Sequence, residues 1–297
     1  MGGILSPRLG VLALLIIATT FGSNHVAARI AFDHGASVTT AVAVRSGFTA
    51  LVLFALMRAL GVPMALPRST LARAVSIGAL IAVQSFCLYS SVARIPVALA
   101  LLAFNTFPML LALLSWATGG DRPGVRALLA MPVALAGLAL ALDVVGKAGD
   151  IAGRWQEIGA GVGWAIGAAI SFALALLLTA RWLKEVDGRL RTFLMMGVTA
   201  ILVIVAGIAT DSFDFPAAPA GWIGLALLTV FYGSAITALF IVLPHLGTAN
   251  YAVVLNFEPI ALMFMAWIAL GQAMNATQVL GAFLVVGAVT YLATGKR

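Results

Sequence analysis

The stretch GTANYAVVLNFEPIALMFMAWIALG, residues 247–271, has a counterpart 151 positions earlier in PVALALLAFNTFPMLLALLSWATGG, residues 96–120. Aligned without gaps, the two stretches share Ala98/Ala249, Asn105/Asn256, Pro108/Pro259, Leu111/Leu262, Trp116/Trp267 and Gly120/Gly271. Asn, Pro and Trp are scarce in so apolar a chain, so the matches at these residues are the main evidence for a repeat. At nearly the same shift, Gly47 and Thr49 match Gly197 and Thr199. The chain is therefore predicted to use one unit twice, over residues 9–145 and 158–294.

The composition indicates an integral membrane protein. Of 297 residues, 63% are apolar and 9% are charged, which lies far from the average of soluble domains. Windows of about 20 mostly uncharged residues are long enough to cross a bilayer as helices. We place ten such windows, at 9–29, 36–57, 71–92, 96–118, 125–145, 158–180, 192–210, 219–241, 247–270 and 275–294. The expected fold class is an all-α membrane bundle of ten transmembrane helices, whose longest connections are 146–157 and 181–191.

Five helices per unit is an odd number, so the second unit enters the membrane from the opposite face. The prediction is two inverted five-helix repeats around a central cavity. Inverted repeats are typical of secondary transporters, in which exchanging the conformations of two similar halves moves the opening from one side to the other. Channels also have inverted repeats, so a passive facilitator or channel stays open as an alternative.

The distribution of basic residues predicts the topology. The side that holds both termini carries Arg8, Arg58, Arg68, Arg73, Arg122, Arg126, Arg181, Lys184, Arg189, Arg191, Lys296 and Arg297. The other side carries Arg29, Arg94, Lys147 and Arg154, while Arg45 falls within a span. By the positive-inside rule both termini are expected in the cytoplasm, with the chain in the cell (inner) membrane. The net charge of +7 is thus explained by topology, and no nucleic-acid partner is expected.

Several of these features resemble the EamA-type branch of the drug/metabolite transporter superfamily. The resemblance is carried by Glu258-Pro259, by Pro108, by Gly120 and Gly271 at the ends of these helices, by FGSNHVAAR at 21–29 and by Arg45. It covers about residues 10–294 and implies that helices one to four and six to nine line or gate the cavity, while five and ten brace the outside. Many members have Gly-Glu where this chain has Gly120-Asp121 and Gly271-Gln272.

Glu258 lies within one of the most apolar spans. A charged side chain at mid-bilayer costs about 2.5–3.5 kcal/mol on insertion scales, so it is expected to face a cavity or a partner. A carboxyl group that is neutral when dehydrated and charged when hydrated suits proton coupling, and a solute ammonium is the alternative partner. A third interpretation is structural: the acid hydrogen-bonds backbone groups that Pro259 leaves free.

Pro108 and Pro259 occupy equivalent points, where each removes a backbone hydrogen bond and can open carbonyls toward a cavity. Asn105 and Asn256 precede them by three residues. Each asparagine either binds solute or satisfies the freed carbonyls, and for Asn105 we favour the second role. Paired helix breaks in two halves point to a site between them.

Other polar and aromatic residues on the spans complete the candidate pathway. His25 titrates near neutrality and rivals Glu258 as proton carrier, although a hydrogen-bonded interhelical histidine is the commoner role. Arg45 can bind a solute carboxylate or fix a neighbouring helix. The remaining candidates are Asn24, Gln84, Ser85, Tyr89, Tyr232 and Tyr251, whose aromatic members suit an amino-acid-like or amine solute.

The function predicted from the sequence is export of small metabolites by alternating access. The resemblance favours amino acids, including aromatic ones, as substrates; a drug or amine exporter of the same fold is the alternative. No Walker loop, CxxC, HExxH or GxSxG motif occurs, so neither an enzyme, nor a cofactor, nor a metal site is expected. The expected partners are a small-molecule substrate and the lipid bilayer, and a monomer is the default oligomeric state.

Overall fold

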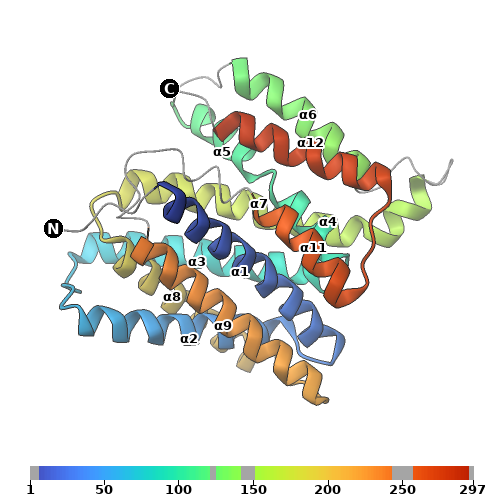
Figure 1. Cartoon of the computed structure of the whole chain (residues 1–297). Coiled ribbons are helices and arrows are strands. Elements are labelled where there is room, and N and C mark those ends of the chain that lie inside the picture. The colour runs from blue at the N-terminus through green and yellow to red at the C-terminus, as the bar shows by residue number, and fades with distance from the viewer. Residues whose placement is uncertain (1–6, 121–124, 142–150, 243–256, 294–297) are drawn as a thin grey trace.

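In the computed structural model, every regular element of the described residues is an α-helix (Figure 1). The structure describes residues 7–120, 125–141, 151–242 and 257–293. The helices are α1 (Pro7–Asp33), α2 (Val38–Ala59), α3 (Arg68–Val92), α4 (Val97–Phe104), α5 (Phe107–Ala117), α6 (Val125–Ala141), α7 (Ile151–Trp182), α8 (Gly188–Ala209), α9 (Pro219–Val242), α11 (Glu258–Leu270) and α12 (Ala276–Ala293).

Seven stretches of the described chain are long and apolar enough to cross a membrane. They are Leu9–Asp33, Val38–Ala59, Arg68–Val92, Val97–Ala117, Ile158–Trp182, Gly188–Ala209 and Pro219–Ala238. Shorter apolar helices cover Leu129–Ala141, Glu258–Leu270 and Ala276–Ala288, within the other three predicted windows. The chain is a multi-pass membrane protein, and the count of ten spans stays a prediction.

The fourth predicted span is two helices, α4 and α5, separated at Asn105 and Thr106. Pro108 stands in the first turn of α5, where its missing N–H leaves no intrahelical bond unmade. The Thr106 hydroxyl donates to the Ala103 carbonyl at 2.8 Å, and the Asn105 amide donates to the Leu101 carbonyl at 2.8 Å. Side chains at the break therefore bind carbonyls at the end of α4.

The predicted connection 146–157 is partly helical, because α7 begins at Ile151. A hydropathy window finds the membrane-crossing part of a helix and not a polar extension beyond it. The expectation of a loop up to residue 157 was wrong for this reason. The opposite connection, 181–191, does contain a break, between Trp182 at the end of α7 and Gly188 at the start of α8.

Contacts between the first and second halves of the chain come in matching pairs. Helix α1 packs on α9, and the repeat-related helices α7 and α3 also pack on each other. In the same way, the contact of α1 with α11 corresponds to that of α7 with α4 and α5. The contact of α2 with α9 corresponds to that of α8 with α3. Two further pairs, α2 with α8 and α6 with α12, map onto themselves when the halves are exchanged. Figure 1 shows α6 and α12 side by side at one edge of the bundle, away from α2 and α8.

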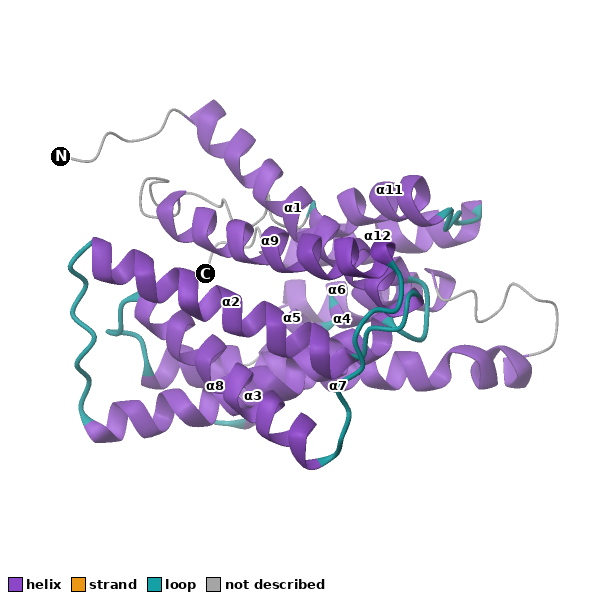
Figure 2. Ribbon diagram, turned by 90° about the horizontal axis from the view of Figure 1, so that it is seen from below, coloured by secondary structure: helices purple, strands orange, loops and turns teal. Residues whose placement is uncertain are grey.

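Glycines allow the closest approaches between these helices. A Cβ added at Gly224 of α9 would lie 2.7 Å from the backbone nitrogen of Ala31 in α1, and one at Gly22 would lie 3.2 Å from that of Leu262 in α11. Gly137 of α6 and Gly281 of α12 are in backbone contact. Such close packing holds α1 between α9 and α11 (Figure 1), and Figure 2 shows these three helices on one side of the bundle, with α3 and α8 on the opposite side.

Candidate functional site

A buried tyrosine connects α1 to α3. Tyr89 has no exposed surface, and its hydroxyl donates a hydrogen bond to the Oδ1 atom of Asn24 at 2.9 Å. The Tyr89 ring lies 5.8 Å from the ring of His25 and 5.9 Å, edge-on, from that of Phe32. Tyr89 therefore orients two consecutive polar residues of α1, both of which are buried.

Arg45 brings a cation into the same region from α2. Only 4% of this residue is exposed, and its Nη2 atom donates to the Ser85 hydroxyl at 2.9 Å. The guanidinium carbon lies 4.0 Å from the ring centroid of Tyr232 and 4.9 Å from that of Tyr89. These distances are typical of cation–π contacts, which stabilise a dehydrated cation by about 2 kcal/mol.

Glu258 begins α11 and faces α1. Its Oε1 atom lies 3.7 Å from Nε2 of His25, and the side chains are 28% and 8% exposed, respectively. Pro259 occupies the first turn, where a proline favours a helix start, and a carboxylate at this end interacts favourably with the helix dipole. The close approach of Gly22 to Leu262 places α11 near enough for this contact.

These contacts join five helices through one group of side chains, here called the polar cluster: Asn24, His25, Arg45, Ser85, Tyr89, Tyr232 and Glu258. Within the described part of the chain, three buried atoms of the cluster have no hydrogen-bond partner. They are Nδ2 of Asn24, Nδ1 of His25 and Nε of Arg45. Because buried polar groups are nearly always paired, these atoms are candidates for binding water or another small molecule.

The other predicted residues lie apart from this cluster or at its margin. Gln84 is half-buried and accepts from the Ser85 hydroxyl at 3.3 Å, so it lies at the margin. Asn105 binds the Leu101 carbonyl within its own helix. Pro108 and Pro259 stand at the starts of α5 and α11. The two remaining candidates, Tyr251 and Asn256, lie outside the described residues.

Comparison with known proteins assigns this arrangement to a family. The sequence profile of the EamA-like transporter family matches residues 8–142 and 159–294, which together make up most of the chain. The chain belongs to the EamA-like transporter family. It is thus a membrane transporter of the drug/metabolite transporter superfamily.

A curated transporter and a solved structure are also similar to this chain. The uncharacterized transporter sll1319 of Synechocystis sp. is 24% identical over 234 residues, which are 76% of this chain and 67% of that protein. A crystal structure of another protein superposes with a TM-score of 0.64 at 19% identity, covering 96% of each chain. The second likeness concerns the fold alone.

Sequence reasoning missed two polar residues in this EamA-like chain. The Ser46 hydroxyl, next to Arg45 on α2, is buried without a partner among the described residues, and so is the Thr237 hydroxyl of α9. Serine and threonine are common in membrane helices, where their hydroxyls often bond the carbonyl four residues earlier. No signal in the sequence distinguishes an unpaired hydroxyl from these.

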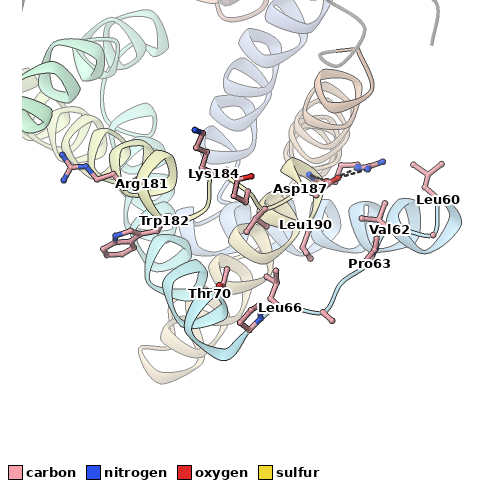
Figure 3. Close-up of a pocket in the computed structure, with 16 residues that line it drawn as sticks. Leu60, Val62, Pro63, Leu66, Thr70, Arg181, Trp182, Lys184, Asp187 and Leu190 are labelled. Atoms are coloured by element: carbon pink, nitrogen blue, oxygen red, sulfur yellow. Dashed lines mark hydrogen bonds and ion pairs between the residues drawn. The ribbon is translucent and has the colours of Figure 1, made fainter. Parts of the chain in front are cut away.

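A second polar feature of the transporter lies at the ends of its helices. A surface cavity of about 850 Å³ is bounded by the α2–α3 connection and by the segment from the end of α7 to the start of α8. Figure 3 shows Leu60, Val62 and Pro63 on one side of it and Arg181 and Trp182 on the other. It shares no residue with the polar cluster, so it is not the candidate site.

Two of the charged groups at this cavity, Asp187 and Arg189, pair with each other. Asp187 caps α8 by accepting from the backbone N–H of Arg189 at 2.8 Å, and its other oxygen lies 2.8 Å from Nη2 of Arg189. The hydrogen bond from the Arg189 side chain is the main reason that the pKa of Asp187 lies below its usual value. Among the residues that the structure describes, no group of three His, Cys, Asp or Glu side chains could hold a metal.

Proposed function

We propose that this EamA-like transporter exports amino acids from the cytoplasm by alternating access, with aromatic amino acids among its substrates. Its two halves, residues 9–145 and 158–294, would be inverted five-helix repeats in the inner membrane, with both termini in the cytoplasm. The polar cluster would be the solute site between them. This function combines a family of membrane transporters with a buried, polar and aromatic group of side chains.

The observation that carries the proposal is the position of the polar cluster between the two halves. Asn24, His25, Arg45 and Tyr89 come from the first half, whereas Tyr232 and Glu258 come from the second. Relative movement of the halves would take these groups apart or bring them together. A solute bound among them would consequently be released when the halves rearrange, as alternating access requires.

The paired helix contacts support the mechanism. Since α1 packs on α9 as α3 packs on α7, the two halves can exchange roles without new kinds of interface. The break before Pro108 gives a hinge position in the first half, and α11 starts at the equivalent point of the second half, just before Pro259. Chain breaks of this kind commonly surround the binding site of a secondary transporter.

The position of the first half that corresponds to Glu258 is apolar, so only the second half supplies an acid to the proposed site. Phe107 stands where the second half has Glu258, and its ring lies 4.9 Å from that of Phe172 and 5.4 Å from that of Phe104. A single polar site between otherwise similar halves suits one small solute. The aromatic rings on either side suit a solute with an apolar side chain.

In this proposal Glu258 and His25 handle positive charge. A carboxylate 3.7 Å from an imidazole can share a proton with it or bind a solute ammonium in its place. The Tyr232 ring of α9 lies 5.9 Å from that of Phe21 of α1, in an edge-on arrangement. It adds an aromatic surface on α9 next to α1. Ammonium groups bind favourably to both carboxylates and aromatic faces.

Counterflow in proteoliposomes tests the function. Vesicles preloaded with one unlabelled amino acid would receive labelled amino acid outside, and uptake would be followed across pH for the wild type and Glu258→Gln. Asp33→Asn is the matched control, because Asp33 is an α1 carboxylate paired with Arg29 at 2.8 Å outside the cluster. We expect saturable counterflow that Glu258→Gln reduces or makes insensitive to pH, whereas Asp33→Asn leaves it unchanged.

The alternatives give different results in the same assay. Flux that does not saturate and shows no counterflow would identify a passive facilitator or channel. Counterflow of cationic dyes or amines, with none for amino acids, would identify a drug or amine exporter. Amino-acid counterflow that Glu258→Gln leaves untouched would make Glu258 a structural residue at the start of α11.

A further inference from the structure

The starting observation is a buried cation for which the described residues show no ion pair. Arg45 is 4% exposed in a membrane-spanning helix, and among the described residues no ion pair joins it to a carboxylate. Two other arginines do have a carboxylate partner, since Arg29 pairs with Asp33 and Arg189 with Asp187. A charged side chain at this depth is costly to keep, so an unpaired one indicates a function.

The surroundings of Arg45 leave the edge of its guanidinium group for a ligand. Tyr232 and Tyr89 contact its guanidinium carbon at 4.0 and 4.9 Å from their ring centroids. One edge donor, Nη2, is used by the Ser85 hydroxyl, while Nε has no partner. A guanidinium edge with free N–H groups matches the planar shape of a carboxylate.

Asn24 supplies a second donor beside the same tyrosine. Its Oδ1 atom accepts from the Tyr89 hydroxyl, which fixes the amide so that Nδ2 is the unpaired atom. The Tyr89 hydroxyl thus bonds Asn24, and the Arg45 guanidinium lies beside the same tyrosine, 4.9 Å from its ring centroid. Two buried residues with unused N–H donors, one of them charged, call for an anionic acceptor.

The opposite chemistry lies next to these donors. His25 follows Asn24 in α1, contacts Tyr89 ring to ring at 5.8 Å, and lies 3.7 Å from Glu258. The polar cluster therefore has a donor-rich end at Arg45 and Asn24 and an acidic end at Glu258, bridged by Tyr89 and His25. A solute with a carboxylate and an ammonium group close together is complementary to both ends.

We propose that Arg45 and Asn24 form a carboxylate-binding subsite, so that the transporter takes zwitterionic α-amino acids and rejects amines that lack the carboxylate. This inference rests on the proposed function and adds to it the orientation of the solute. The carboxylate lies at the α2 side of the polar cluster and the ammonium lies toward α11. Amines without a carboxylate leave the Arg45 and Asn24 donors buried and unpaired, which is the basis of rejection.

Competition by three compounds that share the same side chain tests the subsite. The labelled probe is L-phenylalanine, or the amino acid with the strongest counterflow, and the competitors are the unlabelled acid, its carboxamide and the decarboxylated amine. In the wild type we expect the acid to compete about ten- to hundredfold better than the other two, because the carboxamide offers Arg45 only one neutral acceptor and the amine offers none. Equal competition by acid and carboxamide would overturn the inference.

Variants of Arg45 test whether this residue causes the preference for the acid over the carboxamide. Arg45→Gln should bring the acid down to the level of the carboxamide, and Arg45→Lys should restore part of the preference because it keeps the charge and loses the planar edge. Arg94→Gln is the matched control: Arg94 lies 5.7 Å from the ring centroid of Trp164 and is exposed, outside the polar cluster. If Arg45→Gln retains the wild-type preference for the acid, the inference is wrong.

If Arg45→Gln does not fold, which gel filtration in detergent would reveal, a variant of Asn24 tests the subsite instead. Asn24→Asp keeps an acceptor for the Tyr89 hydroxyl and replaces the free N–H donor by an anionic oxygen, so it should weaken competition by the acid and spare that by the carboxamide. Equal weakening of both would overturn the inference. Absence of counterflow for every amino acid overturns the proposed function, whereas saturable counterflow indifferent to the carboxylate overturns the subsite alone.

Discussion

Nε2 of His25 lies 3.7 Å from Oε1 of Glu258, so that the only acid of α11 faces the only histidine of α1. The two residues belong to different halves of the chain and are 233 positions apart. Their charges depend on where a proton or a solute ammonium is held. In the proposed function, the charge of this pair would be linked to the distance between α1 and α11, and with it to the arrangement of the two halves.

The first prediction is that His25 and Glu258 act as one unit. His25→Gln and Glu258→Gln should each lower counterflow, and the double variant should lose less than the two single losses combined. Residues in direct contact usually show interaction energies of about 0.5–3 kcal/mol in such cycles. Counterflow rates of the four proteins, at matched amounts in vesicles, give this energy.

The same cycle with Asp33→Asn in place of Glu258→Gln serves as control, because Asp33 pairs with Arg29 on the exposed end of α1. Additive losses for His25 and Glu258, like those expected for His25 and Asp33, would show that the 3.7 Å approach has no functional weight.

The second prediction separates the two tyrosines that contact Arg45. Tyr89→Phe removes the only described partner of Asn24 Oδ1 and leaves a buried amide unpaired, at a cost of about 1–3 kcal/mol. Tyr232→Phe keeps the ring 4.0 Å from Arg45 and loses only a 3.7 Å contact to the Met196 sulfur. Thermal melting should show a large loss for Tyr89→Phe and little for Tyr232→Phe. Equal losses would mean that the hydroxyl of Tyr89 does not organise the cluster.

Much of the fold follows from hydropathy alone, because crossing a bilayer demands about 20 apolar residues in a helix. The predicted windows therefore coincide with α1, α2, α3, α8 and α9 within a few residues. The failures have local causes. Pro108 lies in the first turn of a new helix, α5, inside a span whose mean hydropathy stays high, and residues 151–157 extend α7 beyond the apolar window.

The site is harder to predict, since its contacts join distant parts of the chain. The residue types at Asn24, His25, Arg45 and Glu258 attract attention in the sequence because they are polar within apolar spans. Nothing in the sequence says that Arg45 stacks on Tyr232, 187 positions away, or that it bonds Ser85. Conversely, Asn105 is also polar within an apolar span, but its side chain bonds the Leu101 carbonyl of the helix that it ends.

The third prediction concerns the contact between α6 and α12. A Cβ at Gly281 would collide with the backbone of Gly137 and Ala141, whereas one at Gly287 of the same helix meets nothing within 4 Å. Gly281→Ala should therefore cost about 1–3 kcal/mol through overpacking, and Gly287→Ala should be neutral or stabilise by up to about 1 kcal/mol. Melting temperatures in detergent compare the two. A Gly281→Ala protein as stable as wild type would show that α6 and α12 are not in backbone contact.

The fourth prediction concerns the cap of α8. Asp187→Ala removes the acceptor of the Arg189 N–H and should lower stability by about 1 kcal/mol, while Asp187→Asn keeps a cap and should lose less. The side chain of Asp187 is 38% exposed, so solvent screening keeps the contribution of its ion pair with Arg189 small.

The pH dependence of the same cap has a definite sign. Because the folded protein holds the pKa of Asp187 below the unfolded value of about 3.9, the charged carboxylate stabilises the protein above that pH. This contribution falls as the pH is lowered through the folded pKa. Melting temperatures measured between about pH 6 and pH 3 should therefore decline slightly more for wild type than for Asp187→Asn, which cannot titrate at this position. Parallel curves would show that the carboxylate charge at the start of α8 adds nothing beyond the hydrogen bond to the Arg189 backbone.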